Sequence, residues 1–368
     1  HLAERGYSVT LIEAHRVGFG ASGRNGGQLG SGQRQDQETL ENLVGPEDAL
    51  KLWQQAEEAK ALVKGLIAKY NMDCHLKSGI AHACFSQADM AHEHASANHL
   101  RDRYGYDQIE TLEAEAFRAL VPSPTYHGGS LDMGAAHLHP LAYAFGLARA
   151  ASAAGVQIFE RSEVHHIQRG PNAVVQTAQG RVLANHVILA CNGYLGGLDR
   201  KVAARVMPIN NFIIATEPLG AETARIVTRD IAVADSKFVV NYYRLSHDGR
   251  LLFGGGESYG YKFPSDITAT VRKPMLEIYP HLRDVKIDYS WGGTLAITMK
   301  RMPFLTRLAP NMLSASGYSG HGVGTATHAG KLMADAIAGQ AEGFDTMSRV
   351  PSTVFPGGTM MRSPLLAL

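Results

Sequence analysis

Hydrophobic positions follow two different periods along this chain, and the period changes near residue 208. In residues 46–70 and 140–154, apolar side chains recur at helical spacing, and a proline lies in the first turn of each segment. Residues 208–298 instead contain short runs rich in β-branched and aromatic residues, at 212–216, 238–245, 250–254 and 285–291. These runs predict an antiparallel sheet in this part of the chain.

Segments typical of a parallel sheet lie near both ends of the chain. Residues 8–13 form an apolar run that follows a helix-ending glycine and finishes in Glu13. Residues 312–316 form a similar run, followed by a glycine-rich turn at 317–324 and a predicted helix at 325–338. Strand, turn and helix in this order are the units of a dinucleotide-binding fold. Because such units lie at both ends, we expect one domain to be discontinuous in sequence.

The amino-acid composition argues against several classes of function for this chain. The chain has 368 residues and a formal net charge of +1, so it carries no basic footprint for nucleic acid. It contains no apolar stretch long enough to span a membrane. Three cysteines cannot close a disulfide framework, which favours a reducing, cytoplasmic setting. The 17 histidines do not join other ligand residues in a recognised zinc spacing, so we expect no metal.

Two features suggest nucleotide chemistry. Glu13, at the end of its strand, can accept hydrogen bonds from both hydroxyls of an adenosine ribose; a plain exposed glutamate is the alternative. The sequence GASGRNGGQ at 20–28 lets backbone N–H groups approach an anion or a flat ring closely. Within it, Ser22 could bind a pyrophosphate oxygen and Arg24 could neutralise charge. The alternative for this segment is a flexible surface loop.

With Glu13, this motif resembles the FAD-dependent D-amino-acid oxidase/glycine oxidase/sarcosine oxidase superfamily, and within it the gamma-glutamylputrescine oxidoreductase group. Four further stretches fit the same resemblance and span nearly the whole chain: AHLHP at 136–140, YYRL at 242–245, WGGT at 291–294 and GYSGHGV at 317–323. The resemblance implies a fold of mixed α/β and α+β character. A Rossmann-like FAD-binding domain (1–45, 136–207 and 299–368) would be joined to an antiparallel-sheet substrate domain (46–135 and 208–298). The family's first strand and GxGxxG turn are expected upstream of His1.

The resemblance also implies which residues contact FAD. Glu13 would bind the ribose, Ser22 the pyrophosphate and Val164 the adenine region. The other implied cofactor-binding residues are Arg24, Asn25, Gly26, Gly27, Gln28, Ala190, Asn192, Gly193, Gly320, His321, Gly322 and Val323. The last four precede a predicted helix, whose N–H groups would stabilise the reduced flavin at its N1/C2-carbonyl edge. Residues 21–28 contain neither His nor Cys, so we expect the FAD to be non-covalent.

The implied reaction is oxidation of an amine to an imine that then hydrolyses, with oxygen or another acceptor taking the electrons. No acid or base side chain is obligatory. The substrate-contact candidates are Tyr243, Arg244, Trp291 and His321, although tyrosine and arginine on a strand often serve only packing and surface charge. Residues 293–298 lack the carboxylate-binding arginine of the superfamily's simple amino-acid oxidases. A gamma-glutamylated polyamine or related amine is therefore the expected substrate.

Two other interpretations stay open at this point. A chain without the upstream glycine turn could be a cofactor-free fragment that acts as a non-catalytic interaction module. An NAD(P)-dependent dehydrogenase is disfavoured, because the second glycine-rich turn at 317–323 would have no role in it. The flavin interpretation depends on these two turns, near residues 22 and 320, meeting at one cavity.

Overall fold

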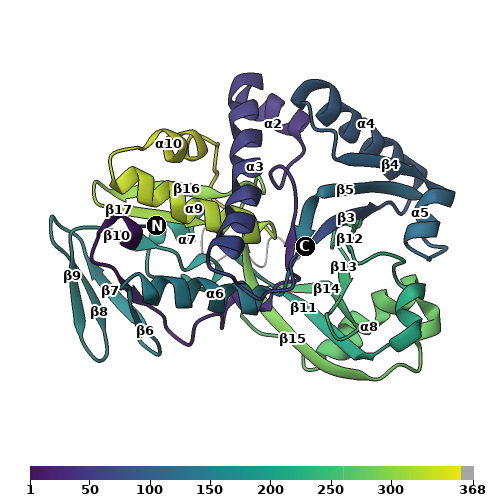
Figure 1. Cartoon of the computed structure of the whole chain (residues 1–368). Helices are drawn as coiled ribbons and strands as arrows, with labels where there is room; N and C mark the ends of the chain where they lie inside the picture. Colours follow the sequence, from purple (N-terminus) through teal and green to yellow (C-terminus); the bar gives the residue numbers. More distant parts are fainter. Residues whose placement is uncertain (260, 358–368) are drawn as a thin grey trace.

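The structure is a computed structural model that describes residues 1–259 and 261–357. Figure 1 shows a large sheet and several small sheets. Around the large sheet lie α4 (Gln87–Tyr104), α5 (Ala114–Leu120) and α8 (Ile267–Ile278), and with the small sheets lie α6 (Pro140–Ala153), α9 (Gly322–Ile337) and α10 (Glu342–Ser348). The long helix α3 (Pro46–Lys69) lies between these two parts. Residues 358–368 of the predicted segment 299–368 lie outside the described residues.

In the described part of the chain, the large sheet has nine strands. In order across the sheet they are β15 (Ile287–Ile297), β11 (Met207–Pro218), β14 (Arg250–Tyr259), β13 (Tyr242–Leu245), β12 (Ala232–Asp235), β3 (Lys77–Ala83), β5 (Gly128–His137) and β2 (Gln28–Leu29), with β4 (Ile109–Glu113) also paired to β5. The predicted antiparallel sheet is confirmed for β11, β13, β14 and β15. A parallel pairing of β12 with β3 extends it with strands from the first half of the chain.

The two faces of this sheet have different surroundings, because successive side chains of a strand point to opposite sides. One face packs on α5 (Ala114–Leu120) and α8 (Ile267–Ile278) in the largest apolar core of the described residues. Tyr243, Phe212 and Phe253 belong to that core. The opposite face carries more polar side chains and lines a cavity.

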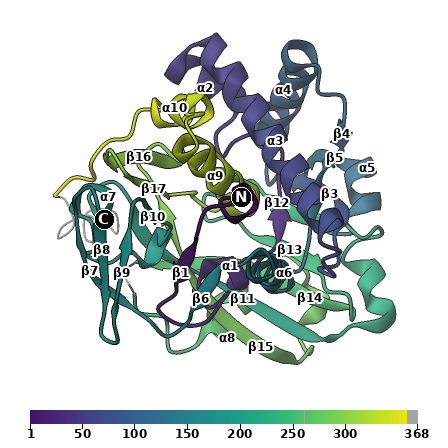
Figure 2. The ribbon, with the colours of Figure 1, turned by 60° about the vertical axis from the view of Figure 1, so that its left-hand side comes forward.

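The second part of the molecule contains three smaller sheets. Their strands are β1 (Thr10–Ile12) with β6 (Gln157–Phe159), β10 (Val187–Leu189) with β17 (Met312–Ser316) and β16 (Phe304–Ala309), and β7 (Val164–Gln168) with β8 (Ala173–Thr177) and β9 (Arg181–Ala184). The β1–β6 and β10–β17 pairs are parallel, as a dinucleotide-binding fold requires. Figure 2 brings this part forward and shows β1 and β6 near α1 and α6.

The helices predicted at 46–70, 140–154 and 325–338 form as α3, α6 and α9. Outside those already named, the helices of the described residues are η1 (Ala3–Arg5), α1 (Ala21–Arg24), α2 (Gln37–Val44), η2 (Asn192–Tyr194), α7 (Arg200–Ala203), η3 (Gly220–Arg225) and η4 (Pro280–Leu282). Proline occupies the first turn of both α3 and α6. Helix α9 begins three residues earlier than the pattern predicts, within the glycine-rich segment 317–324.

Two predicted strands differ from the structure. Residues 8–13 were expected to form a buried strand, but β1 is partly open to solvent and Leu11 is 42% exposed, because β1 pairs with only β6 among the described strands. In the predicted strand at 238–245, only Tyr242–Leu245 is extended and paired. Residues 238–240 instead lie at the cavity, where no neighbouring strand is paired with them, and Phe238 is 83% exposed.

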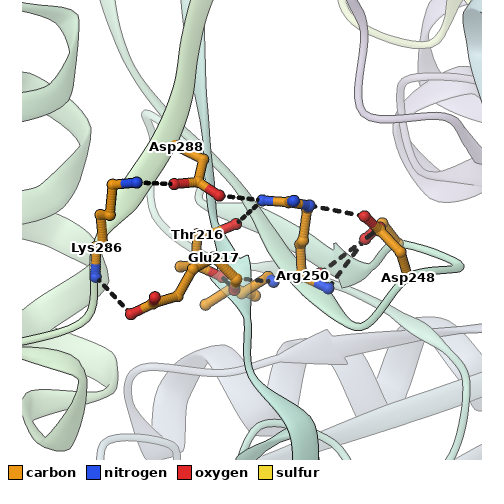
Figure 3. Close-up of polar contacts among 8 residues, drawn as sticks. Thr216, Glu217, Asp248, Arg250, Lys286 and Asp288 are labelled. Carbon is orange, nitrogen blue, oxygen red and sulfur yellow. Dashed lines mark hydrogen bonds and ion pairs between the residues drawn. The ribbon is translucent and has the colours of Figure 1, made fainter.

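A polar cluster joins the ends of three strands in the large sheet (Figure 3). The Arg250 guanidinium forms ion pairs with Asp248 at 2.7 Å and with Asp288 at 2.6 Å, and it donates to the Thr216 carbonyl at 2.9 Å. The Lys286 ammonium reaches the other oxygen of Asp288 at 3.0 Å. One arginine thus connects β11, β14 and β15. It is the first residue of β14, and Glu257 lies near the other end of that strand.

Candidate active site

A cavity of about 2340 Å³ separates the two parts of the molecule. It extends from the space between β1 and β10 to the polar face of the large sheet. Pockets for one small ligand usually measure about 300–1,000 Å³. The volume of the cavity is therefore large enough for two ligands, a dinucleotide near the small sheets and a smaller molecule under the large sheet.

The first glycine-rich turn forms one wall of the cavity. The Asn25 side chain holds the turn in place: its Oδ1 accepts from the Gly27 amide at 2.8 Å, and its Nδ2 donates to the Ala21 carbonyl at 2.9 Å. Gly27 has φ +79°, and a Cβ added there would lie 1.9 Å from the Leu138 carbonyl oxygen. A Cβ at Gly26 would meet the Tyr242 ring at 2.6 Å. The turn is thus packed tightly between β5 and β13, and only glycine fits at these two positions.

The Arg24 guanidinium contacts two backbone carbonyls and an aromatic ring. It lines the cavity, but its Nε donates to the Phe19 carbonyl at 2.6 Å and its Nη1 donates to the Gly292 carbonyl at 3.0 Å. Its guanidinium also stacks on the Phe19 ring. These contacts fasten α1 to β15, so Arg24 acts first as a structural link.

The remaining cofactor candidates lie along the cavity with one exception. Those that line it are Glu13, Ser22, Gln28, Val164, Ala190 and Asn192. The Glu13 carboxylate accepts from the His15 amide at 2.9 Å, which orients it at the end of β1. Gly193 lies behind the wall, where a Cβ would come within 2.7 Å of the Leu295 carbonyl oxygen. Its absence of a side chain permits close packing of η2 against β15.

The second glycine-rich turn reaches the same cavity. Gly320, His321, Gly322 and Val323 all line it, and α9 begins there without a side-chain cap. Gly320 has φ +89°, and nothing lies within 4 Å of a Cβ built on it. The first amide groups of α9 are therefore available to an anion or a carbonyl oxygen in the cavity.

His321 connects the two turns. Its Nε2 lies 3.0 Å from the Gly32 carbonyl oxygen, and a Cβ at Gly30 would approach its ring at 2.9 Å. Burial, followed by the charge of Arg34, lowers the pKa of His321 to about 4. The imidazole is therefore neutral at physiological pH, and its Nε2 donates to Gly32 in the corresponding tautomer.

Three of the four substrate candidates do not line the cavity. Tyr243 is 1% exposed and points into the core, where its hydroxyl lies 3.3 Å from that of Tyr126. The Arg244 Nε donates to the Gly26 carbonyl at 2.7 Å, and the Trp291 Nε1 donates to the Arg24 carbonyl at 3.1 Å. Both side chains support the first turn from behind it. Of the four, only His321 faces the cavity.

The structure brings to the cavity several residues that sequence reasoning missed. They are Arg34, His82, Asp132, Asn211, Asp235, Tyr242, Glu257 and Arg301. Tyr242 replaces Tyr243 as the tyrosine of β13 that faces the cavity, and its hydroxyl donates to Asn211. Strand alternation made one of these two tyrosines a cavity residue, but the sequence did not show which. Burial raises the pKa of Asp235 to about 6, against the opposing effect of its hydrogen bonds from Asn241.

The residues present fit FAD. The site combines a closely packed glycine turn, an acid at the end of a parallel strand and an uncapped helix N-terminus, all on one elongated cavity. Among residues 1–259 and 261–357, no group of three histidine, cysteine or acidic residues is arranged to hold a metal ion. No helix in the same ranges is both long and apolar enough to cross a bilayer.

Known proteins place this site in a family. Residues 1–336 match the DAO family, described as FAD dependent oxidoreductase. The chain is 41% identical over 372 residues to "Probable oxidoreductase OrdL" of Rhizobium meliloti (strain 1021), covering 100% of this chain and 86% of that protein. It is 40% identical over 371 residues to gamma-glutamylputrescine oxidoreductase of Escherichia coli (strain K12), covering 100% and 87%.

The crystal structure of glycine oxidase from Geobacillus kaustophilus has the same fold, with a TM-score of 0.77 and 19% identity over 92% of this chain and 90% of that one. The predicted resemblance and mixed fold class are confirmed. The chain belongs to the DAO family of FAD-dependent oxidoreductases, and it is an enzyme that oxidises amines or amino acids with FAD.

Proposed function

We propose that this enzyme oxidises the free amine of a gamma-glutamylated polyamine. One observation carries the proposal: the two glycine-rich turns meet at a cavity whose other wall is the polar face of the large sheet. The 40% identity with gamma-glutamylputrescine oxidoreductase over the full chain supports this class of substrate. The bound FAD supplies the acceptor for a hydride equivalent from the carbon beside the amine nitrogen, before the imine hydrolyses and oxygen or another acceptor takes the electrons.

Cofactor binding is assigned to residues along the cavity. Glu13 binds the ribose hydroxyls, Ser22 contacts the pyrophosphate, and Val164 meets the adenine through its backbone. The residues proposed beside the rest of FAD are Asn25, Gly26, Gly27, Gln28, Ala190, Asn192, Gly320, His321, Gly322 and Val323. The α9 N-terminus begins at the cavity without a side-chain cap, so its partial positive charge would stabilise negative charge at the N1/C2-carbonyl edge of a bound FAD. We assign no covalent bond to the FAD.

The large-sheet side binds and orients the amine. Tyr242 donates its hydroxyl proton to Asn211, so its oxygen lone pairs stay free to accept from an amine N–H. Asp235 lies on the same wall, and its pKa, raised to about 6 by burial, lets it exchange a proton near neutral pH. The reaction needs the neutral amine, and a nearby carboxylate that takes up its proton favours that form.

A plain α-amino acid fits the cavity less well. Residues 293–298 contribute Gly293, Leu295 and Ala296 to the lining, and none of these can bind a carboxylate through its side chain. A substrate whose carboxylate lies far from the oxidised carbon does not need a carboxylate-binding side chain at residues 293–298. Gamma-glutamylputrescine has that arrangement, since its free amine and its α-carboxylate are at opposite ends.

The test is anaerobic reduction of the purified natural protein. We expect visible flavin absorbance that bleaches on addition of gamma-glutamylputrescine, and faster than with putrescine, glycine or sarcosine. In air, ammonia, the aldehyde product and the reduced acceptor should form in equal amounts. A protein without bound flavin, or one whose flavin is bleached fastest by glycine, contradicts the proposal.

A further inference from the structure

Two arginines face the cavity from distant parts of the chain. Arg34 follows β2, and its Nε donates to the Ser319 carbonyl at 3.1 Å. Arg301 lies between β15 and β16, and its guanidinium stacks over the Phe238 ring at 5.8 Å. In the described ranges, the arginines that form ion pairs are Arg5, Arg169, Arg225, Arg250, Arg307 and Arg349. Arg34 and Arg301 are therefore cations without an acidic partner there.

The two arginines come from segments that are in contact: the Gln35 Nε2, next to Arg34, donates to the Lys300 carbonyl, next to Arg301, at 3.0 Å. Burial is the larger of two effects that lower the pKa of the Arg34 guanidinium, and the charge of Arg301 is the smaller. Two like charges at a partly desolvated cavity are unfavourable, and a bound anion relieves both the repulsion and the loss of solvent. The cavity wall therefore favours a negatively charged ligand at this place.

The backbone of Arg301 adds a second, independent observation. Its φ of +58° lies in the left-handed region, which glycine occupies with much less strain. Arginine at this position is therefore unfavourable for the local backbone. Strained residues concentrate at ligand-binding sites, where the side chain has a use that offsets the strain.

We propose that Arg34 and Arg301 together bind the α-carboxylate of the substrate's glutamyl group, an inference that rests on the function proposed above. Paired guanidinium groups suit a carboxylate, because each offers a planar set of N–H donors. Both arginines line the cavity. The pair would therefore provide the carboxylate contact that residues 293–298 do not provide. The enzyme would then select its substrate by the glutamyl group, at the end opposite to the amine that is oxidised.

Glu257 complements this pair. It lines the same cavity from β14, and it accepts from the Tyr259 hydroxyl at 2.8 Å. The charge of Arg301 also acts on Tyr259, where it opposes the rise of the pKa that burial causes. Glu257, Tyr259 and Arg301 thus belong to one neighbourhood, and Glu257 is placed to bind the α-ammonium of the same glutamyl group.

The experiment compares Arg34→Met and Arg301→Met with the parent holoenzyme. For each, kcat and KM are measured for gamma-glutamylputrescine and for N-acetylputrescine, which has the same amine and amide but no carboxylate. We expect the ratio of the two kcat/KM values to fall by about 10–100-fold, through KM of the glutamyl substrate. Arg161→Met is the matched control, since Arg161 also has a left-handed φ (+52°) but does not line the cavity. Its ratio should equal that of the parent.

Binding of glutarate, followed through the flavin spectrum, tests the arginines without catalysis. The parent should bind glutarate, and Arg34→Met and Arg301→Met should bind it at least tenfold more weakly. The proposal is overturned if the parent does not bind glutarate, if KM rises equally for both amines, or if the variants lose FAD instead. A parent that binds glutarate but does not oxidise gamma-glutamylputrescine contradicts only the function proposed above. Arg34→Lys and Arg301→Lys provide folded variants that keep the charge and lose the planar donor set.

Discussion

Two adjacent tyrosines on β13 show how much one position changes a residue's role. Tyr242 faces the cavity, and Tyr243 lies in the core with its hydroxyl beside those of Tyr126 and Tyr279. The side chains are chemically identical, and they differ only in the side of the sheet to which the strand directs them. The chemistry available to each is therefore set by the pleat of the strand.

The two tyrosines should respond differently to loss of the hydroxyl. Tyr243→Phe removes buried hydrogen bonds and should lower the free energy of unfolding by about 1 kcal/mol, with kcat/KM close to that of the parent. Tyr242→Phe should lower kcat/KM roughly tenfold, about 1.4 kcal/mol of transition-state stabilisation, and change stability less. Urea unfolding and steady-state kinetics on both variants measure these effects. The reverse pattern would place the substrate on the other face.

At the scale of elements, the first glycine-rich turn is held from both sides. The Leu138 amide donates to the Gly27 carbonyl at 2.9 Å, while the Leu138 carbonyl lies where a Cβ of residue 27 would stand. Arg244 and Asn25 bind the same turn through the Gly26 carbonyl and the Gly27 amide. The turn cannot shift to make room for a side chain, because its own hydrogen bonds hold it against β5.

Gly27→Ala should therefore affect both folding and cofactor binding. The left-handed φ and the clash with Leu138 should lower the free energy of unfolding by roughly 2 kcal/mol or more. FAD affinity should fall in the same variant, as measured by flavin fluorescence titration. Gly65→Ala is the control: it lies in α3, nothing lies within 4 Å of a Cβ there, and it should raise stability by about 0.5–1 kcal/mol. Equal stability of the two variants would show that the turn is more adaptable than this packing implies.

At the scale of the whole molecule, stability is coupled to pH through a buried imidazole at the end of β5. His137 ends β5 and is 2% exposed, and its Nδ1 has no hydrogen-bond partner in the described residues. Burial, followed by the charge of Arg244, lowers the pKa of His137 to about 4. The folded protein thus keeps this histidine neutral at a pH where the unfolded chain is already protonated.

Stability should consequently fall on mild acidification. Between the unfolded pKa of about 6.5 and the folded value, the unfolded chain binds one more proton than the native one, so stability decreases as pH falls through this window. His137 should account for about 2 kcal/mol between pH 7 and pH 5. His137→Gln should reduce the pH dependence by that amount, whereas His186→Gln, at an exposed position, should leave it unchanged. Parallel curves for the parent and His137→Gln would contradict this assignment.

Sequence by itself determined the local elements and the family. Proline and glycine residues at the helix ends located α3, α6 and α9 in the sequence. Proline is favoured in the first turn of a helix and glycine just after its end, whatever the tertiary structure. The glycine-rich turns were recognisable for the same reason, and the comparison with known proteins confirmed the family that they indicated. These properties depend on residues close together in the chain.

Only the tertiary structure decided which side chains share the cavity. The parallel pairing of β12 with β3 joins segments about 150 residues apart, and no local pattern encodes that pairing. The tertiary structure also shows that Tyr242 and not Tyr243 faces the site, and that Arg34 and Arg301 line the same cavity. Such proximity results from burial of the apolar face of the sheet against α5 and α8, which acts on the folded chain as a whole.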